Sequence, residues 1–155
     1  MAADFLLGCT YNFLQQEDEA PPLSRFQMVR DAGVFDYINW LPKPEQLSAC
    51  VTAPEKTGIP MLTGNYIHQL GRNDEMLADS MRNAARAGIK MVNVMLGTYG
   101  ADGHELTDDE IIDTYLRTAE AGDKVGVALS FELHVDCWSE KYKRVTPIIQ
   151  AVKNR

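Results

Sequence analysis

The sequence lacks an apolar run long enough for a membrane helix. None of its uninterrupted apolar stretches approaches roughly 18 residues, and the start, Met1-Ala-Ala-Asp4, lacks the basic flank of a secretion signal. Only three cysteines are present, Cys9, Cys50 and Cys137, an odd number at long spacings that suits neither a disulfide framework nor a zinc knuckle. We therefore expect reduced thiols, a cytoplasmic location and no membrane partner.

Basic residues are also in the minority. Fifteen Lys and Arg residues stand against 22 Asp and Glu residues, which gives a formal net charge of −7, and no basic cluster occurs. The net negative charge would repel the phosphate backbone of a nucleic acid. The sequence thus disfavours a nucleic-acid partner.

The common nucleotide and acyl-transfer motifs are missing. Thr10-Tyr-Asn-Phe-Leu14 stands where a first βα turn would carry Gly-x-Gly-x-x-Gly, and no Gly-Lys-Ser/Thr loop occurs. The acidic run Glu17-Asp-Glu19 in the same turn would oppose the phosphate of a flavin nucleotide. No Gly-x-Ser-x-Gly elbow or Cys/His pairing indicates acyl transfer. Dinucleotide, nucleoside triphosphate and acyl-transfer sites are therefore disfavoured.

What the 155 residues do contain is a repeated junction between helix and strand. At Gly33, Gly58, Gly88 and Gly126, a helical stretch ends on glycine and an apolar, strand-like run follows. Glycine adopts the left-handed conformation that ends a helix, and β-branched residues directly after it favour a strand. With Phe5 to Cys9 as the first strand, the pattern predicts five strands, each followed by a helix, in a parallel sheet.

Helix starts are marked by side chains that can accept hydrogen bonds from backbone N–H groups. Thr107-Asp-Asp-Glu110 fits a capping box. Asn73 and Ser139 are the predicted caps of the third and the last helix.

Five βα units fit two architectures. A flavodoxin-like doubly wound sheet uses five units in about this length, whereas a closed (β/α)8 TIM barrel needs eight units and about 250 residues. In Val127 to His134, every second residue from Val127 to Leu133 is apolar, whereas the residues between them end in Ser130, Glu132 and His134. A central doubly wound strand should be apolar on both faces, whereas a barrel strand turns one face to a lumen with a polar mouth. The patterning favours a partial barrel, with the flavodoxin-like sheet as the alternative.

Ligands of parallel α/β folds bind at the carboxyl ends of the strands, so polar residues there are the candidates for chemistry. Glu132 and His134 belong to the alternating run Glu132-Leu-His-Val-Asp136 after the fifth strand. Asn65 and His68 lie in the cluster after the third strand. A paired or capping carboxylate is an equally good interpretation of Glu132, and a hydrogen-bonded loop histidine is an alternative for both histidines.

Aromatic side chains near the strand ends could form the walls of a pocket or could be ordinary packing. They include Tyr11, Trp40 and Tyr99. His104 lies in a turn-rich loop, and we expect it to face solvent.

These residues resemble the xylose isomerase-like TIM barrels, a family that includes sugar isomerases, sugar phosphate epimerases and the endonuclease IV group (AP endonuclease family 2 type). The resemblance lies in Gly64-Asn-Tyr-Ile-His-Gln-Leu-Gly71, in Ala87-Gly-Ile-Lys-Met-Val-Asn-Val94 and above all in Val127-Ala-Leu-Ser-Phe-Glu-Leu-His-Val-Asp-Cys-Trp-Ser-Glu140. It covers the whole chain but only the first five of the family's eight units. It implies that residues 1–155 form a single domain, the N-terminal five-eighths of such a barrel.

The resemblance also implies a role for the candidate residues. Glu132 takes the position at which the family's strand-five glutamate binds a divalent metal (Mn²⁺, Mg²⁺ or Co²⁺) and, in epimerases, moves a proton, so it would be both the catalytic residue and a metal ligand. Asn65 and His68 would orient sugar hydroxyls, and the other candidates for substrate contact are His134, Tyr11, Trp40 and Tyr99. The family's remaining metal ligands come from strands six to eight, so we expect a truncated chain that is inactive alone.

The leading expectation is metal-dependent isomerisation or epimerisation of a sugar or sugar phosphate, with the small-molecule sugar as partner. An open half barrel exposes strand edges, so assembly into a homo-oligomer is also expected. The alternatives are a non-catalytic flavodoxin-like binding or regulatory module and an endonuclease IV-like DNA repair enzyme.

Overall fold

The five strands form one parallel sheet in which each strand pairs with its neighbour in the sequence. A computed structural model describes residues 6–10 and 20–154. The strands are β1 (Gly8–Thr10), β2 (Tyr37–Asn39), β3 (Met61–His68), β4 (Met91–Leu96) and β5 (Ala128–Phe131), in the order β1-β2-β3-β4-β5. A flavodoxin-like sheet has the order 2-1-3-4-5. The flavodoxin-like alternative is therefore wrong, and the predicted partial (β/α)8 barrel is confirmed.

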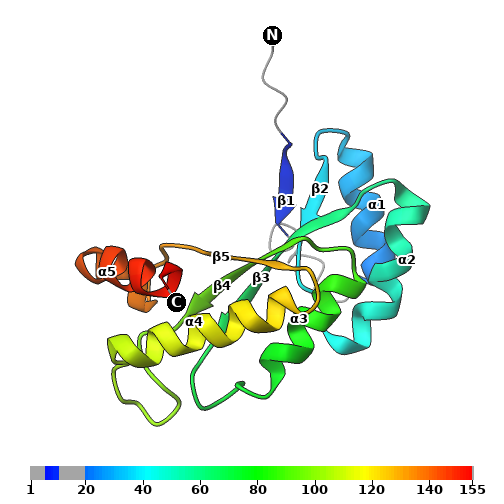
Figure 1. The fold of residues 1–155 in the computed structure, drawn as a ribbon. Coiled ribbons are helices and arrows are strands. Elements are labelled where there is room, and N and C mark those ends of the chain that lie inside the picture. The colour runs from blue at the N-terminus through cyan, green and yellow to red at the C-terminus, as the bar shows by residue number, and fades with distance from the viewer. Residues whose placement is uncertain (1–5, 11–19, 155) are drawn as a thin grey trace.

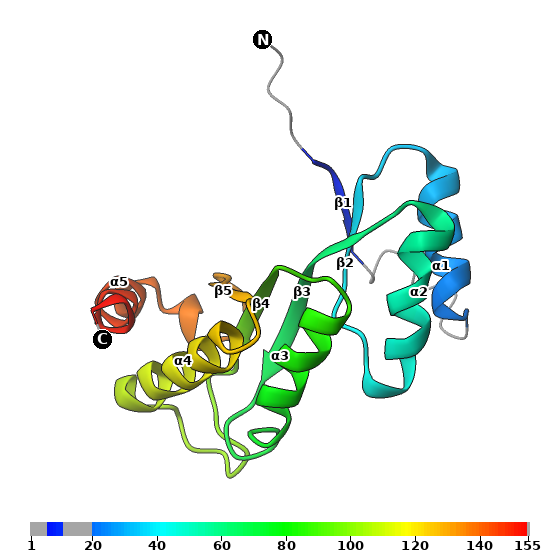
Figure 2. The same cartoon turned by 45° about the vertical axis from the view of Figure 1, so that its right-hand side comes forward.

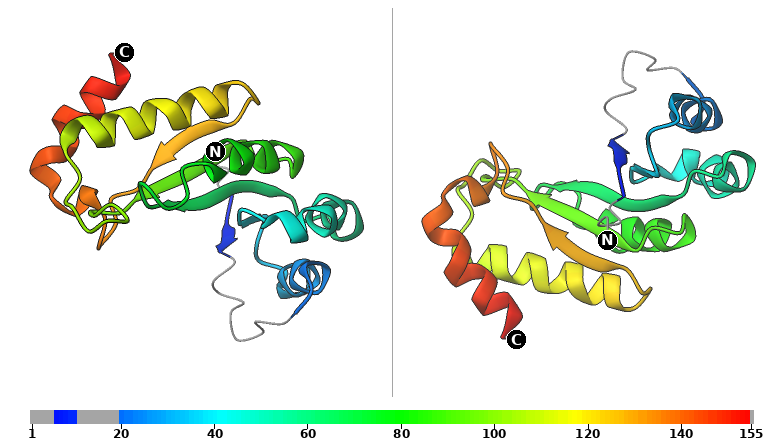
Figure 3. Two further views of the ribbon diagram at one scale, coloured as in Figure 1. Left: turned by 90° about the horizontal axis from the view of Figure 1, so that it is seen from below. Right: turned by 90° about the horizontal axis from the view of Figure 1, so that it is seen from above.

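Each strand is followed by a helix, and the helices follow one another around one face of the sheet (Figures 1 and 2). They are α1 (Pro22–Ala32), α2 (Leu47–Thr57), α3 (Met76–Arg86), α4 (Asp108–Asp123) and α5 (Tyr142–Lys153), with short 3-10 turns at Pro44–Gln46 (η2) and Trp138–Glu140 (η3). Seen from below and from above, the other face of the sheet has no described helix packed on it (Figure 3). None of the helices in the described part of the chain has the length and apolar character needed to cross a bilayer.

The junction glycines have the predicted conformation. Gly33, Gly58, Gly88 and Gly126 all have positive φ angles, between 68° and 83°. A residue with a Cβ would be strained there, so glycine is the residue that lets each helix end and the chain turn back toward the sheet.

One of the three predicted helix caps is confirmed. Thr107 Oγ1 accepts from the Glu110 N–H at 3.3 Å, and the Glu110 carboxylate accepts from the Thr107 N–H at 2.9 Å. The caps predicted at Asn73 and Ser139 are wrong, because Glu75 precedes α3 and Ser139 lies inside η3. Both side chains instead bond to backbone in the loops at the carboxyl edge of the sheet.

The core lies between the sheet and the helices, so each strand has two different faces. On β4, Val92, Val94 and Leu96 are almost fully buried against the helices. The other parity faces away from them, and Met91 on β4 and Ile67 on β3 remain 39% and 70% exposed. The exposed inner face is the one that a barrel turns to its lumen.

Candidate functional site

Glu132 directly follows β5 at the carboxyl edge of the sheet. Its side chain is exposed, and its Oε2 accepts a hydrogen bond from Asn93 Nδ2 on the neighbouring strand at 2.5 Å. Within residues 6–10 and 20–154, no group donates a hydrogen bond to Oε1. One carboxylate oxygen is thus held by the sheet, and the other is free to meet a ligand.

A lateral row of uncharged polar side chains crosses the inner face beside Glu132. Asn65 of β3, Asn93 of β4 and Ser130 of β5 are in register on adjacent strands. Ser130 Oγ donates to Asn93 Oδ1 at 3.4 Å. Barrel interiors are usually filled by branched aliphatic side chains, so this row is unusual for a purely structural layer. Amides and hydroxyls both donate and accept, which suits a ligand rich in hydroxyl groups.

Two hollows meet at this edge of the sheet and share Asn65 and Glu132. The first has a volume of about 340 Å³, and Asn39, Thr63, Asn93 and Ser130 also line it. The second has about 470 Å³ and is lined in addition by Ile67, Met95 and His134. Both volumes are in the range of small-molecule sites, and most of the residues that line the first hollow are polar.

His134 lies beside Glu132 in the second hollow. Its backbone N–H donates to Ser139 Oγ at 3.2 Å, and its Nδ1 lies 2.6 Å from the Val135 carbonyl oxygen. Because a carbonyl oxygen can only accept, Nδ1 carries the proton in a neutral ring and leaves Nε2 as an acceptor or ligand atom. Among the described residues Nε2 has no hydrogen-bond partner, so this histidine can contact a substrate.

His68 does not reach either hollow. Its side chain is 1% exposed on the helix-facing side of β3, with Nε2 2.9 Å from Asp74 Oδ1. Burial lowers the pKa of this imidazole, and the Asp74 charge opposes that shift. Side chains alternate along a strand, so His68 and Asn65, three positions apart, must lie on opposite faces. Asn65 therefore lines both hollows, whereas His68 packs on the other face at the start of the β3–α3 loop.

The three predicted aromatic wall residues have different positions. Trp40 belongs to the buried core, at 8% exposure, and lies outside the lining of both hollows. Tyr11 is outside the described residues. Tyr99 is 54% exposed and lines a third hollow, of about 530 Å³, together with Asp136 and Lys141.

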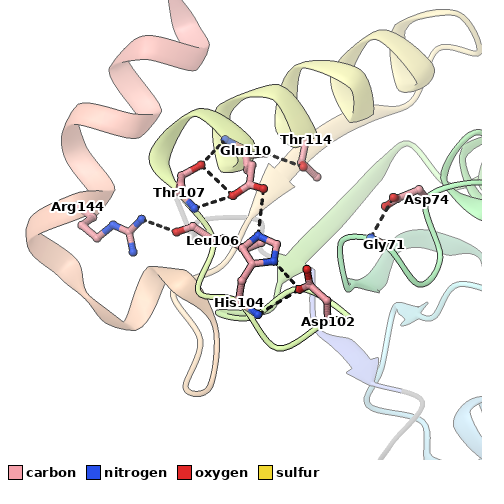
Figure 4. A network of polar contacts seen from close by, with 9 residues as sticks. All are labelled: Gly71, Asp74, Asp102, His104, Leu106, Thr107, Glu110, Thr114 and Arg144. Carbon is pink, nitrogen blue, oxygen red and sulfur yellow. Dashed lines mark hydrogen bonds and ion pairs between the residues drawn. The ribbon is translucent and has the colours of Figure 1, made fainter.

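His104 is exposed, as the sequence predicts, and its ring also links two carboxylates (Figure 4). Its Nδ1 lies 2.5 Å from Asp102 Oδ1, and its Nε2 lies 3.0 Å from Glu110 Oε1. The Asp102 contact first, and then the Glu110 contact, raise the pKa of His104 above the ordinary 6.5. The hydrogen bond from His104 lowers the pKa of Asp102, and bonds from Thr107 lower that of Glu110. The imidazolium ties the loop that carries Tyr99 to the start of α4.

This arrangement makes a pH-dependent contribution to stability. The contribution of His104 is fully present below pH 6.5 and is lost as the pH rises through the raised pKa, whereas the contribution of the carboxylates is lost in acid, as the pH falls through their lowered pKa values. We expect the melting temperature of the wild type to exceed that of His104→Gln most at about pH 5 to 6. Thermal melts of both proteins between acid and pH 9 measure this. A difference that does not change with pH would contradict the interpretation.

A divalent metal would find one carboxylate ligand at this edge of the sheet. Glu132 has the free oxygen that a hard cation prefers, and Asn93 orients it as outer-shell groups do in metal sites. In the described part of the chain, no three His, Cys, Asp or Glu side chains come together to hold an ion. The residues fit one ligand of such a site, and further ligands would have to come from other chain segments.

The sequence interpretation missed several residues of the site. Asn93 is recognisable in sequence only as a polar residue between Val92 and Val94, and its bond to Glu132 depends on the register of β4 and β5. Tyr37 also lines the first hollow. The end of the Tyr37 ring lies over Gly8 of β1, so a side chain at position 8 would displace that ring.

Comparison with known proteins yields similar folds only. No protein-family model matches the sequence, and no curated protein matches it significantly. Among solved structures, the chain is similar to L-ribulose 3-epimerase, with a TM-score of 0.74 and 16% identity over 97% of this chain and 58% of that one. It is similar to the IolI protein with a bound zinc atom, with a TM-score of 0.67 and 18% identity over 97% of this chain and 60% of that one.

An AP endonuclease of family 2 from Brucella melitensis is also similar, with a TM-score of 0.60 and 13% identity over 93% of this chain and 65% of that one. These proteins are xylose isomerase-like TIM barrels, so the resemblance noted in the sequence is confirmed at the level of the fold. The chain spans about 60% of the length of the matched structures. The structural neighbours include a sugar epimerase and a zinc-binding protein.

Proposed function

We propose that the chain supplies the first five βα units of a divalent-metal-dependent isomerase or epimerase that acts on a sugar or sugar phosphate. The observation that supports this most strongly is the position of Glu132, held by Asn93 at the carboxyl edge of the sheet, with one oxygen free toward a hollow lined by amides and hydroxyls. In parallel barrels this edge is where catalytic residues lie.

In this proposal, one side chain transfers the proton and the others orient the sugar. The free oxygen of Glu132 can take a proton from the sugar carbon next to the carbonyl group and return it to the carbonyl carbon on the same face, while the hydroxyl proton moves to the former carbonyl oxygen, which isomerises the sugar. Epimerisation would also need a second acid on the opposite face, from another chain segment. Asn65 and Ser130 hydrogen-bond the sugar hydroxyls and fix which carbon faces Glu132, and His134 Nε2 accepts from a further hydroxyl. A divalent ion with Glu132 among its ligands would polarise the carbonyl and adjacent hydroxyl oxygens and so ease enolisation.

The charge around the site supports a sugar over a nucleic acid. Among the residues that line the three hollows, the only cation in the described part of the chain is Lys141, whose Nζ is 2.5 Å from Glu105 Oε1. Binding of a nucleic-acid backbone depends on several unpaired basic side chains. We therefore favour the sugar over the endonuclease IV-like alternative.

The direct test is solvent exchange at the reacting carbon. A panel of ketoses and ketose phosphates is incubated in D₂O with the 155-residue chain, and in parallel with the native protein from its source, in the presence of Mn²⁺, Mg²⁺ or Co²⁺. With the native protein, we expect proton NMR to show deuterium entering next to the carbonyl group of one substrate, and EDTA to stop it, whereas the 155-residue chain alone should show no exchange. Exchange by the native protein that continues in EDTA would contradict the metal dependence, and no exchange by the native protein with any member of the panel would contradict the reaction class.

A further inference from the structure

Asn93 is a residue of the inner face that contacts Glu132 and takes no part in the proposed proton transfer itself. It lies in the middle of β4, in register with Ser130 of β5, and its side chain reaches Glu132. Its backbone is fixed between two strands, so the side-chain amide has a rigid base. A group held in this way can determine the orientation of a neighbour.

The polarity of the network fixes the orientation of the Asn93 amide. Glu132 Oε2 can only accept, so the group 2.5 Å from it must be the Nδ2 donor. Oδ1 then points to Ser130, whose hydroxyl donates to it at 3.4 Å. The opposite orientation would place Oδ1 against a carboxylate and leave Ser130 Oγ facing a donor. The hydrogen bonds therefore run in one direction, with Ser130 of β5 donating to Asn93 of β4 and Asn93 donating to Glu132 at the end of β5.

We propose that Asn93 is the positioning residue of Glu132, and that its amide selects the one carboxylate orientation in which Oε1 faces the substrate and metal. This proposal rests on the proposed function for the role of Glu132, and it adds the residue that orients the Glu132 carboxylate. Glu132 is exposed and follows the last residue of β5, so the strand alone does not restrict its rotamers. Outer-shell partners of metal ligands typically change metal affinity about 10- to 100-fold when they are removed.

The first arm of the test needs no metal. In the wild-type chain, one side-chain amide proton of Asn93 should resonate downfield of ordinary asparagine amides, and Glu132→Ala should return it to the ordinary range. Thr63→Ala is the matched control, because Thr63 lines the same hollow and has no hydrogen bond to either residue among the described contacts. An Asn93 amide that is unaffected by Glu132→Ala would overturn the proposal.

The second arm measures Mn²⁺ affinity by electron paramagnetic resonance. Asn93→Leu keeps the shape of the side chain and removes its donor, and we expect the dissociation constant to rise about 10- to 100-fold. Asn93→Gln keeps an amide donor and should recover part of the loss. Ser130→Ala removes the hydroxyl that donates to Asn93 Oδ1 and leaves the bond to Glu132 in place, so it should have a smaller effect on Mn²⁺ affinity. Circular dichroism establishes that each variant is folded.

The outcomes separate the proposal from the function on which it rests. Equal Mn²⁺ affinity in the wild type and Asn93→Leu would overturn the positioning role. A wild type in which Mn²⁺ binding does not depend on Glu132 would contradict the proposed function, and the amide resonance of the first arm then decides whether Asn93 holds Glu132.

Discussion

Replacing Glu132 with glutamine is expected to lower the rate of proton exchange about 10²- to 10⁴-fold, the usual contribution of a general base. Glutamine keeps the size of the side chain and its bond to Asn93, because its amide oxygen can accept where Oε2 accepts now. It loses the basic oxygen and the negative charge. The loss should therefore appear in the rate constant and in the Mn²⁺ affinity, while the fold is preserved.

Glu120 provides the matched control for this substitution. It lies on the outer side of α4, where it pairs with Lys124 at 2.8 Å and its side chain is 67% exposed. Glu120→Gln makes the same chemical change away from the inner face and should leave exchange unaltered. Deuterium exchange followed by NMR, on both variants and the wild type, measures the difference. Full activity in Glu132→Gln would refute the assignment of this residue.

Trp138→Ala is expected to destabilise the chain by about 3 to 5 kcal/mol, the range for large buried aromatic residues. Trp138 is fully buried and stacks on Phe131 of β5 with ring centroids 6.5 Å apart. Its indole N–H donates to the Tyr115 hydroxyl of α4 at 3.0 Å. Burial raises the pKa of Tyr115 to about 12, in keeping with a phenol kept from water. The substitution would open a cavity and leave that hydroxyl without its donor.

Urea unfolding followed by far-UV circular dichroism measures this loss, since the variant also removes a fluorescent reporter. Tyr142→Ala is the control, because Tyr142 lies at the start of α5 and is 71% exposed, and a change there should stay within about 0.5 kcal/mol. A Trp138→Ala variant as stable as Tyr142→Ala would contradict the packing of the β5–α5 connection.

Features that depend on a few consecutive residues could be predicted from the sequence. The junction glycines need a positive φ whatever surrounds them, and the Thr107 capping box closes within one helical turn. The alternation after Val127 was confirmed only in part. Leu129 and Phe131 pack against the core, but β5 ends at Phe131 and Leu133, of the same parity, is 63% exposed. These local rules favoured the partial barrel, and the strand order then excluded the flavodoxin-like alternative.

Features that depend on contacts between segments could not be predicted in the same way. The sequence placed His68 and Asn65 in one cluster, but alternation along β3 separates them, and Asp74 of the following loop holds His68 on the other face. His104 is exposed as predicted, but its contacts with Asp102 and Glu110 were not predicted, because these are ordinary loop and cap residues when each is considered alone. The bond from Asn93 to Glu132 joins residues 39 positions apart.

The fold by itself does not select the reaction. The structures that resemble this chain include an L-ribulose 3-epimerase, a protein with bound zinc and an AP endonuclease, all at low sequence identity. The choice has to come from the residues at the carboxyl edge of the sheet. Here these residues are one oriented carboxylate and several uncharged hydrogen-bonding groups, which is why a sugar is the proposed substrate.

The measurement that tests this account most directly is a map of Mn²⁺-induced line broadening in the backbone NMR spectrum of the chain. We predict that the first amide signals to broaden lie around Glu132, at Ser130 and His134, and that Glu132→Gln abolishes this effect. Broadening centred on the exposed acidic start of α4 at Asp108 and Asp109, or broadening around Glu132 that persists in Glu132→Gln, would contradict it.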